Sequence, residues 1–309
     1  MASQSRVSSP EVWPELPYDA WKDTLDTLHM SLQIVGKVRL SLTPFEPQWG
    51  NVPLYLSARG LTTTPMEFAG LIFQIDVDLI DHQVLIETAR GETRRVALRA
   101  RPVADFYTEL MSNLSALGIR ATFRPIPDEV DDPIPFAEDT THSAFEPEWA
   151  NRFWRVLSQV DLVLKEHRSH FRGRSSSVQF FWGTFDLAYI RYSGRPNVPR
   201  PGAGLIERLS GDAEQSCAGF WPGDSRFPHP AFYAYTYPKP NGLDMQPIEP
   251  TPAGWNSDLG EFALPYEDVR KSASPPEVML RFFESTYAAG ARLAKWDPRL
   301  LVERSPSRT

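Results

Sequence analysis

The sequence predicts an α+β fold with mostly antiparallel sheets flanked by helices. Four long stretches repeat apolar residues at helical spacing, and about eight to ten shorter ones have the composition or alternation of strands. The 29 prolines among 309 residues require many loops and exclude a helical bundle. Aromatic residues, 12% of the chain and spread along it, argue against disorder.

The N-terminal half is predicted to begin with an amphipathic helix over 20–34, which Gly36 ends. Five strands are expected to follow it, over 38–42, 52–58, 70–80, 83–88 and 95–99. Pro102 then opens a helix over 103–117 with one apolar stripe, ended by Gly118. This half is assigned to 13–124.

The C-terminal half is assigned to 149–297, after an acidic, proline-rich connection over 125–148. A helix over 149–164 is expected first, then a strand region over 178–192 that bends at Gly183, and a loop-rich stretch over 193–230. Two strands are expected next, over 232–237 and 261–264. A helix over 278–293, started by Ser274, follows them. The ends, 1–12 and 303–309, are expected to be flexible.

The two halves share a pattern that predicts pseudo-symmetry. Each has a helix, a glycine followed by a basic residue (Gly36-Lys37 and Gly173-Arg174), several strands and a proline-led helix. The second half has a longer insert between Arg195 and Pro230. Two such halves would pack as one body, with a cleft between them as a place for a ligand. A chance match of pattern is the alternative.

Composition excludes several classes of protein. A formal net charge of -7 disfavours a generic nucleic-acid binder. No apolar run approaches the ~20 residues of a membrane helix, and no signal peptide opens the chain, so a cytoplasmic protein is expected. The single cysteine, Cys217, excludes an internal disulfide and a cysteine-based metal centre.

Several motifs together resemble a family of uncharacterised bacterial and fungal proteins that carries a domain-of-unknown-function label. They include Phe180-Phe-Trp-Gly-Thr-Phe-Asp-Leu-Ala, Ala218-Gly-Phe-Trp-Pro-Gly, Gln33-Ile-Val-Gly-Lys, Ala58-Arg-Gly-Leu-Thr-Thr and Phe232-Tyr-Ala-Tyr. The likeness covers nearly the whole chain, from Trp13 to about Asp297. It implies a shared fold and no established chemistry.

The departures from that family's pattern concern three histidines. The resemblance implies histidines where this chain has Gln48, Gln179 and Ala213, beside a retained Glu214. Three histidines and a carboxylate would suit a divalent transition metal. This chain is therefore expected to bind no metal there, and Gln48, Gln179 and Glu214 are expected to lie near one another.

Two carboxylates are the candidate catalytic residues. Asp186 ends an aromatic run and would act as a general acid or base; the alternative is a structural pair with Arg191 or a turn cap. Glu214 precedes the Phe-Trp-Pro-Gly loop, and a position against Trp221 would raise its pKa; the alternative is an exposed loop glutamate.

Other polar candidates have plainer interpretations. Asp139 and His142 are three residues apart and would pair on a helical turn, unless Asp139 only caps a turn. His167 and His170 have a similar spacing, but basic residues at a helix end complement its dipole. Cys217 would be a nucleophile only beside a histidine, and a lone cysteine is more often a small buried residue.

An aromatic concentration marks the second half. Trp182, Trp221, Tyr233 and Tyr235 are predicted to line a common pocket for a flat or apolar ligand. The alternative is a half-exposed sheet face covered by proline-rich loops. No glycine-rich phosphate loop accompanies them.

The hypothesis that follows is a cofactor-free, metal-free small-molecule enzyme that uses acid–base and shape effects. Glu214 and Asp186 would transfer protons, and Arg191 would hold an anionic group. Gln48, Gln179, Trp182, Trp221, Tyr233 and Tyr235 would complete the substrate site. The reaction is left open among a cyclase, an isomerase and a hydrolase of specialised metabolism. The alternatives are a non-catalytic binding or partner protein that lost an ancestral metal site, and a metal enzyme with other ligands such as Asp139 and His142.

Overall fold

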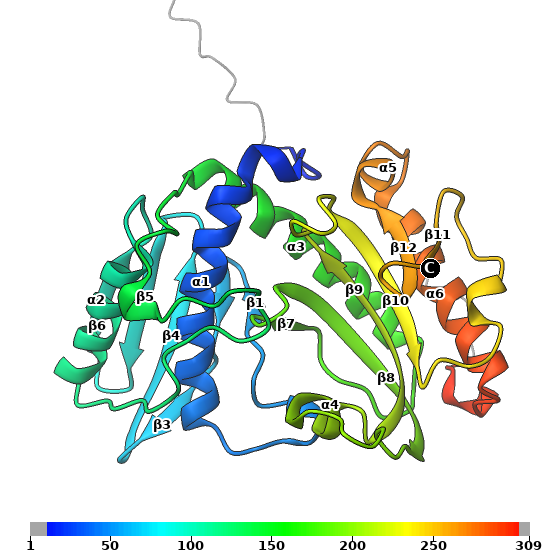
Figure 1. Ribbon diagram of the computed structural model, residues 1–309, viewed down its shortest axis with the longest axis horizontal. Helices are drawn as coiled ribbons and strands as arrows, with labels where there is room; N and C mark the ends of the chain where they lie inside the picture. The colour runs from blue at the N-terminus through cyan, green and yellow to red at the C-terminus, as the bar shows by residue number, and fades with distance from the viewer. Residues whose placement is uncertain (1–10, 303–309) are drawn as a thin grey trace, which may run out of the picture.

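A computed structural model describes residues 11–302, and within them the chain forms six α-helices and twelve strands in two antiparallel sheets (Figure 1). This confirms the predicted α+β class. The long helices are α1 (Tyr18–Leu42), α2 (Val103–Ala116), α3 (Pro147–Ser169) and α6 (Pro275–Leu293). Two short ones are α4 (Leu205–Ser210) and α5 (Tyr266–Arg270).

The first sheet belongs to the N-terminal half. Its strands run in the order β1-β2-β4-β5-β6, with β3 added to β4. They are β1 (Tyr55–Ser57), β2 (Gly60–Thr62), β3 (Met66–Phe68), β4 (Leu71–Asp78), β5 (Gln83–Thr88) and β6 (Thr93–Ala97). Alternate residues of β4 and β5 are buried, as expected for a sheet with one face on the core. Helices α1 and α2 lie on that face (Figure 1).

The second sheet belongs to the C-terminal half and runs in the order β11-β12-β10-β9-β8-β7. Its strands are β7 (Gln179–Phe181), β8 (Asp186–Pro196), β9 (Ala213–Trp221), β10 (Ala231–Tyr237), β11 (Gly254–Asn256) and β12 (Glu261–Pro265). Helices α3 and α6 pack together behind this sheet in Figure 1. The front of β8, β9 and β10 has no helix packed along it in that view.

The two halves meet through their first strands. Leu54, just before β1, exchanges two backbone hydrogen bonds with Phe180 of β7, of 2.9 and 2.8 Å. Each half has a long helix before its sheet and another after it, and the pseudo-symmetry of the halves stays a prediction. The connection over 125–148 contains a short 3₁₀ turn, Phe136–Glu138, and its last two residues belong to α3. One hydrophobic core runs through both halves.

Two of the expected elements are wrong. Gly36 does not end the first helix: α1 continues to Leu42, so the strand expected over 38–42 is helical. Strand β9 lies in the stretch expected to be loop-rich. Ser274 occupies the N-cap of α6, but its side chain makes no capping hydrogen bond. The ends expected to be flexible lie outside the described residues, apart from Glu11 and Val12.

Gly36 is required by packing, which explains why α1 continues through it. A Cβ at this position would overlap the indole ring of Trp182. The Trp182 Nε1 donates to the Val52 carbonyl at 3.0 Å, which fixes the ring against the helix. The ring contact at Gly36 therefore offsets the poor helix propensity of glycine.

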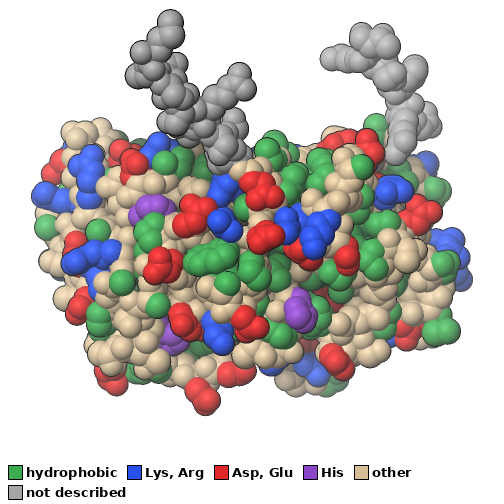
Figure 2. All heavy atoms as spheres, turned by 90° about the horizontal axis from the view of Figure 1, so that it is seen from above, with side chains coloured by type: hydrophobic (Ala, Val, Ile, Leu, Met, Phe, Trp, Pro, Cys, Tyr) green, Lys and Arg blue, Asp and Glu red, His purple; other side chains and the backbone are tan. Residues whose placement is uncertain are grey.

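The upper end of the molecule is a mixed polar surface. Figure 2 shows acidic and basic side chains interspersed among hydrophobic ones on this face. Arg270 of α5 pairs there with Glu267 and with Glu15, just before α1, whose carboxylate is 2.7 Å away. No helix within residues 11–302 has the length and hydropathy needed to cross a bilayer.

We expect Gly36→Ala to lower the free energy of unfolding by about 1–3 kcal/mol, because the added methyl group must displace the Trp182 ring. Gly254→Ala at the exposed first residue of β11 is the control, since its Cβ would meet nothing within 4 Å. Urea unfolding measures both. A Gly36→Ala protein as stable as the wild type would show that the ring does not occupy this position.

Candidate functional site

The candidate site lies on the face of the second sheet that points away from α3 and α6. We call it the aromatic face, and it is built from alternate residues of the three central strands. They are Asp186, Ala188, Ile190, Tyr192, Gln215, Cys217, Gly219, Trp221, Tyr233, Tyr235 and Tyr237. Most of its apolar members form a cluster separate from the main core. The intervening residues, such as Tyr189 and Phe232, point into that core.

Small residues on β8 and β9 allow tyrosine rings to lie across the strands. A Cβ at Gly219 would be 2.5 Å from the Tyr233 ring, so only glycine permits the ring to cross β9 there. The Tyr235 ring is parallel to the Tyr233 ring, with centroids 6.4 Å apart. Tyr235 of β10 and Cys217 of β9 are direct cross-strand neighbours. The small residues Cys217 and Gly219 thus lie beneath the two tyrosine rings.

Asp186 is the polar centre of this face. The Tyr233 hydroxyl donates to Asp186 Oδ2, and the Thr184 hydroxyl donates to Asp186 Oδ1. Burial raises the pKa of Asp186, although both hydrogen bonds oppose the shift. Thr184 is exposed, whereas the Asp186 side chain to which it donates is buried.

The backbone before Asp186 is held in an unusual conformation. Phe185 has a φ of 61°, in the left-handed region that non-glycine residues rarely adopt. Its ring stacks on Phe153 at 5.3 Å and meets Phe180 at 5.2 Å. Core packing therefore fixes the strained residue that aims Asp186 at the aromatic face.

Two more carboxyl groups lie within electrostatic reach of Asp186. Glu261 of β12 lies opposite Tyr235 of β10 in the sheet. Burial raises the pKa of Glu261 to about 7, and the negative charge of Asp186 adds to the shift. Glu129 reaches in from the connection, where its carboxylate lies against Gly183. Loss of water and the charge of Asp186 raise the pKa of Glu129 as well. Within residues 11–302, no basic side chain forms an ion pair with any of the three.

The segment that carries Glu129 is fastened to α1. Gln33 Nε2 donates to the Asp128 carbonyl at 2.7 Å, and Lys37 Nζ lies 2.5 Å from the Asp128 carboxylate. Glu129 itself has a φ of 58°. Helix α1 and the connection thus form one side of the site, although they are far from Asp186 in sequence.

The structure brings four of the sequence candidates to Asp186 and its face. Gln179 is buried and pairs with Ala188 across β7 and β8, so its side chain is on this face. Tyr233 and Tyr235 lie beside Asp186 as described. Trp221 belongs to the same apolar cluster and stacks on Phe227 at 5.8 Å, remaining partly exposed.

Glu214 and Arg191 are on the opposite face. Glu214 accepts hydrogen bonds from Ser193 (2.9 Å) and Arg195 Nε (2.8 Å) at the end of the sheet. Arg191 is fully buried and donates to the His167 carbonyl of α3. The expected Asp186–Arg191 pair is therefore not formed, and Glu214 does not lie against Trp221.

Gln48 and Trp182 occupy other surroundings. The buried Gln48 amide bridges Arg174 and Asp212, with Nε2 2.5 Å from the Asp212 carboxylate. Trp182 is in the main core against Gly36, whereas Trp221 is in the second cluster. The common cavity expected for both tryptophans is not formed, and the closeness of Gln48, Gln179 and Glu214 stays a prediction.

The histidine pairs have structural partners. His142 Nδ1 is 2.7 Å from Asp139 Oδ2, and the backbones of both residues cap the start of α2. His167 and His170 both contact Glu284 of α6, at 2.8 and 2.9 Å. Among the described residues, no three His, Cys, Asp or Glu side chains are grouped closely enough to hold a metal ion.

The chain belongs to a protein family of unknown function, DUF5996, whose model matches residues 13–303. This confirms the resemblance inferred from the motifs at the level of the family. Searches of curated proteins and of solved structures found no match to the chain.

We expect Glu261→Gln to become progressively more stable relative to the wild type as the pH rises from about 4.5 to about 7. Folding raises the pKa of Glu261, so the folded wild type binds more protons than the unfolded chain and loses stability over this window. Urea unfolding at several pH values measures the difference. The exposed Glu87→Gln is the control, and a pH-independent difference for Glu261→Gln would contradict the buried position of this carboxyl.

Cys217 is expected not to react with a thiol-specific reagent in the native protein. Burial raises the pKa of its thiol, which keeps it protonated, and the side chain is 2% exposed. Colorimetric titration should detect one thiol only after unfolding. Rapid reaction of the native protein would restore the nucleophile hypothesis.

Proposed function

We propose that the protein is a small-molecule enzyme that works by proton transfer at the aromatic face. The observation that carries the proposal is Asp186, which receives a hydrogen bond from Tyr233 in an apolar setting with no cationic partner among the described residues. Carboxyl groups with raised pKa values are the usual means by which a site exchanges protons near neutral pH.

The roles follow from the chemistry of each group. Glu261, with its pKa near 7, would accept and return a substrate proton, because a general acid–base works best when its pKa is near the ambient pH. Asp186, whose pKa is raised by burial, would exchange a proton with a substrate oxygen that gains negative charge. Tyr233 would orient Asp186.

The same face offers binding surfaces for a flat or apolar substrate. The partly exposed rings of Tyr235 and Trp221 would pack against it, and the Gln179 amide would bind a polar group. A cyclase, isomerase or hydrolase would fit such a site. Glu214, Arg191, Gln48 and Trp182 are not assigned to it, because their side chains contact other parts of the structure.

A non-catalytic binding or partner protein is the second candidate. It is favoured by the hydrogen bonds that Asp186 already receives from Tyr233 and Thr184, since mutually satisfied groups also occur in purely structural networks. Both candidates have a small-molecule or protein partner and no nucleic acid, given the acidic net charge. A cytoplasmic location suits the single, buried cysteine.

Incubation with a metabolite extract tests the enzyme proposal. We expect the wild type to consume one compound and form another, as detected by mass spectrometry, and Asp186→Asn to lose this conversion by at least about 100-fold. Asp268→Asn, an exposed aspartate of α5, is the matched control. Conversion that is unaffected in Asp186→Asn would rule out this site.

The proposal includes chemistry without a transition metal. We therefore expect the purified, dialysed protein to contain no stoichiometric zinc, iron or manganese, because neither Gln48 nor Gln179 offers the imidazole that such ions favour. Elemental analysis measures this directly. One equivalent of metal bound through Glu214 would overturn this part of the proposal.

A further inference from the structure

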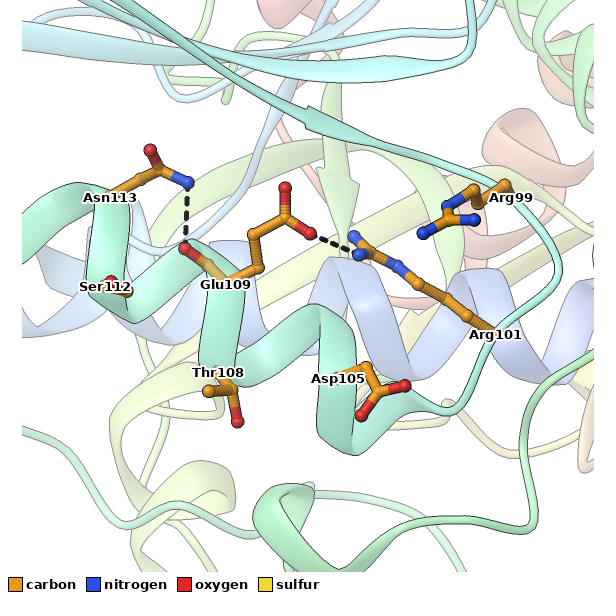
Figure 3. Close-up of a pocket in the computed structure, with 7 residues that line it drawn as sticks. All are labelled: Arg99, Arg101, Asp105, Thr108, Glu109, Ser112 and Asn113. Carbon is orange, nitrogen blue, oxygen red and sulfur yellow. Dashed lines mark hydrogen bonds and ion pairs between the residues drawn. The ribbon is translucent and has the colours of Figure 1, made fainter.

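A second polar site lies in the N-terminal half, away from the aromatic face. A pocket of about 360 Å³ opens between α2 and the segment that follows β6 (Figure 3). Arg99 and Arg101 line it from that segment, and Asp105, Glu109 and Ser112 line it from α2. The volume is at the small end of the range for sites that bind metabolites.

Arg101 is built into the wall of this pocket. Its side chain is only 9% exposed and lies over the Phe106 ring at 5.4 Å. One terminal nitrogen pairs with Glu109, and the other donates to the Ala97 carbonyl at 2.9 Å. The buried Nε has no hydrogen-bond acceptor in the described residues. The guanidinium is thus fixed in place with its hydrogen-bonding capacity incompletely used.

Arg99 adds a second positive charge to the same pocket. Its side chain is exposed and forms no ion pair within residues 11–302. In Figure 3 its guanidinium extends toward that of Arg101, with Glu109 beyond. Two guanidinium groups therefore lie near each other, and Glu109 is paired with Arg101 alone. A further negative group between the two arginines would reduce their mutual repulsion.

We infer that this pocket binds the oxyanion group, a carboxylate or a phosphate, of a small molecule. Arg99 and Arg101 would share its oxygens, since guanidinium groups match the planar spacing of such oxygens. Ser112 would supply a neutral donor. Asp105 at the rim favours a ligand whose remainder is neutral or positively charged over one with several negative groups. The inference does not depend on the proposed function, because no residue is common to both sites.

Nuclear magnetic resonance of the arginine Nε–H groups tests this directly. Inorganic phosphate and acetate are titrated separately into the full-length protein, with sodium chloride at equal ionic strength as the reference. We expect a saturable shift of the Arg101 signal with at least one probe, at a dissociation constant of about 10 mM or lower. Phosphate alone, acetate alone or both would identify which oxyanion the site accepts.

Two arginine variants distinguish specific binding in the pocket from nonspecific attraction of an anion to nearby positive charges. Arg99→Gln should weaken binding at least tenfold, the usual effect of losing a charge-assisted hydrogen bond. Arg95→Gln, at an exposed arginine of β6 that does not line the pocket, should change it less than twofold. Because Arg99 has no ion-pair partner in the described residues, its replacement should leave the unfolding midpoint unchanged.

The inference would be overturned by any of three results. These are the absence of a saturable shift with both probes, a loss of less than tenfold in Arg99→Gln, and an equal loss in Arg95→Gln. Failure here would leave the aromatic face untouched, since the metabolite experiment depends on Asp186 alone.

Discussion

Two backbone hydrogen bonds between Leu54 and Phe180 join the sheets of the two halves, and the position of the candidate site depends on this junction. Phe180 fills the core beneath the junction, and Trp182, two residues on, packs into the space at Gly36. The chain then turns at Gly183 and passes through the left-handed Phe185. The position of Asp186 is the end result of this series of contacts.

The same junction explains why the site takes residues from both halves. Because Trp182 fixes β7 against α1, the turn at Gly183 lies close to the connection, and Glu129 can reach it. His29 of α1 also contacts the Gly183 carbonyl at 3.0 Å. The three carboxyl groups thus come from β8 (Asp186), β12 (Glu261) and the connection (Glu129), and only long-range contacts bring them together.

Sequence patterns predicted elements well where local signals and tertiary contacts agree. Strand β5 occupies the expected 83–88, and α2 begins and ends within a residue of its prediction. Sequence patterns failed to predict elements where tertiary packing overrides local propensity. Gly36 is a helix-ending signal by itself, yet the Trp182 ring requires it inside α1. Strand β9 lacks clear alternation because Cys217, Ala218 and Gly219 are small on both faces, and the Tyr233 ring requires the glycine at 219.

Strand alternation was the available signal for sorting the candidate residues. Asp186 and Arg191 are an odd number of positions apart, so a regular strand must place them on opposite faces. Applied to 178–192, this rule excludes Arg191 from the site of Asp186 by spacing alone. Glu129 and Glu261 had no such signal, since neither lies in a motif and both reach the site only through the fold.

Carboxyl groups on the two sides of β8 have pKa values shifted in opposite directions, and this difference is relevant to the proposed function. On the helix side, burial would raise the pKa of Glu284, but His167, Arg191 and His170 outweigh it and lower the pKa to about 2. Glu284 therefore adds stability above its ordinary pKa, which is lost as the pH falls toward 2.

On the aromatic face, Asp186 and Glu261 have raised pKa values and no compensating cation among the described residues, so their ionisation opposes folding. A neutral, well-packed replacement would serve the fold better at neutral pH. Groups whose ionisation reduces stability are often retained for binding or chemistry. This argument, together with the aromatic content, is the reason for proposing the aromatic face as the functional site.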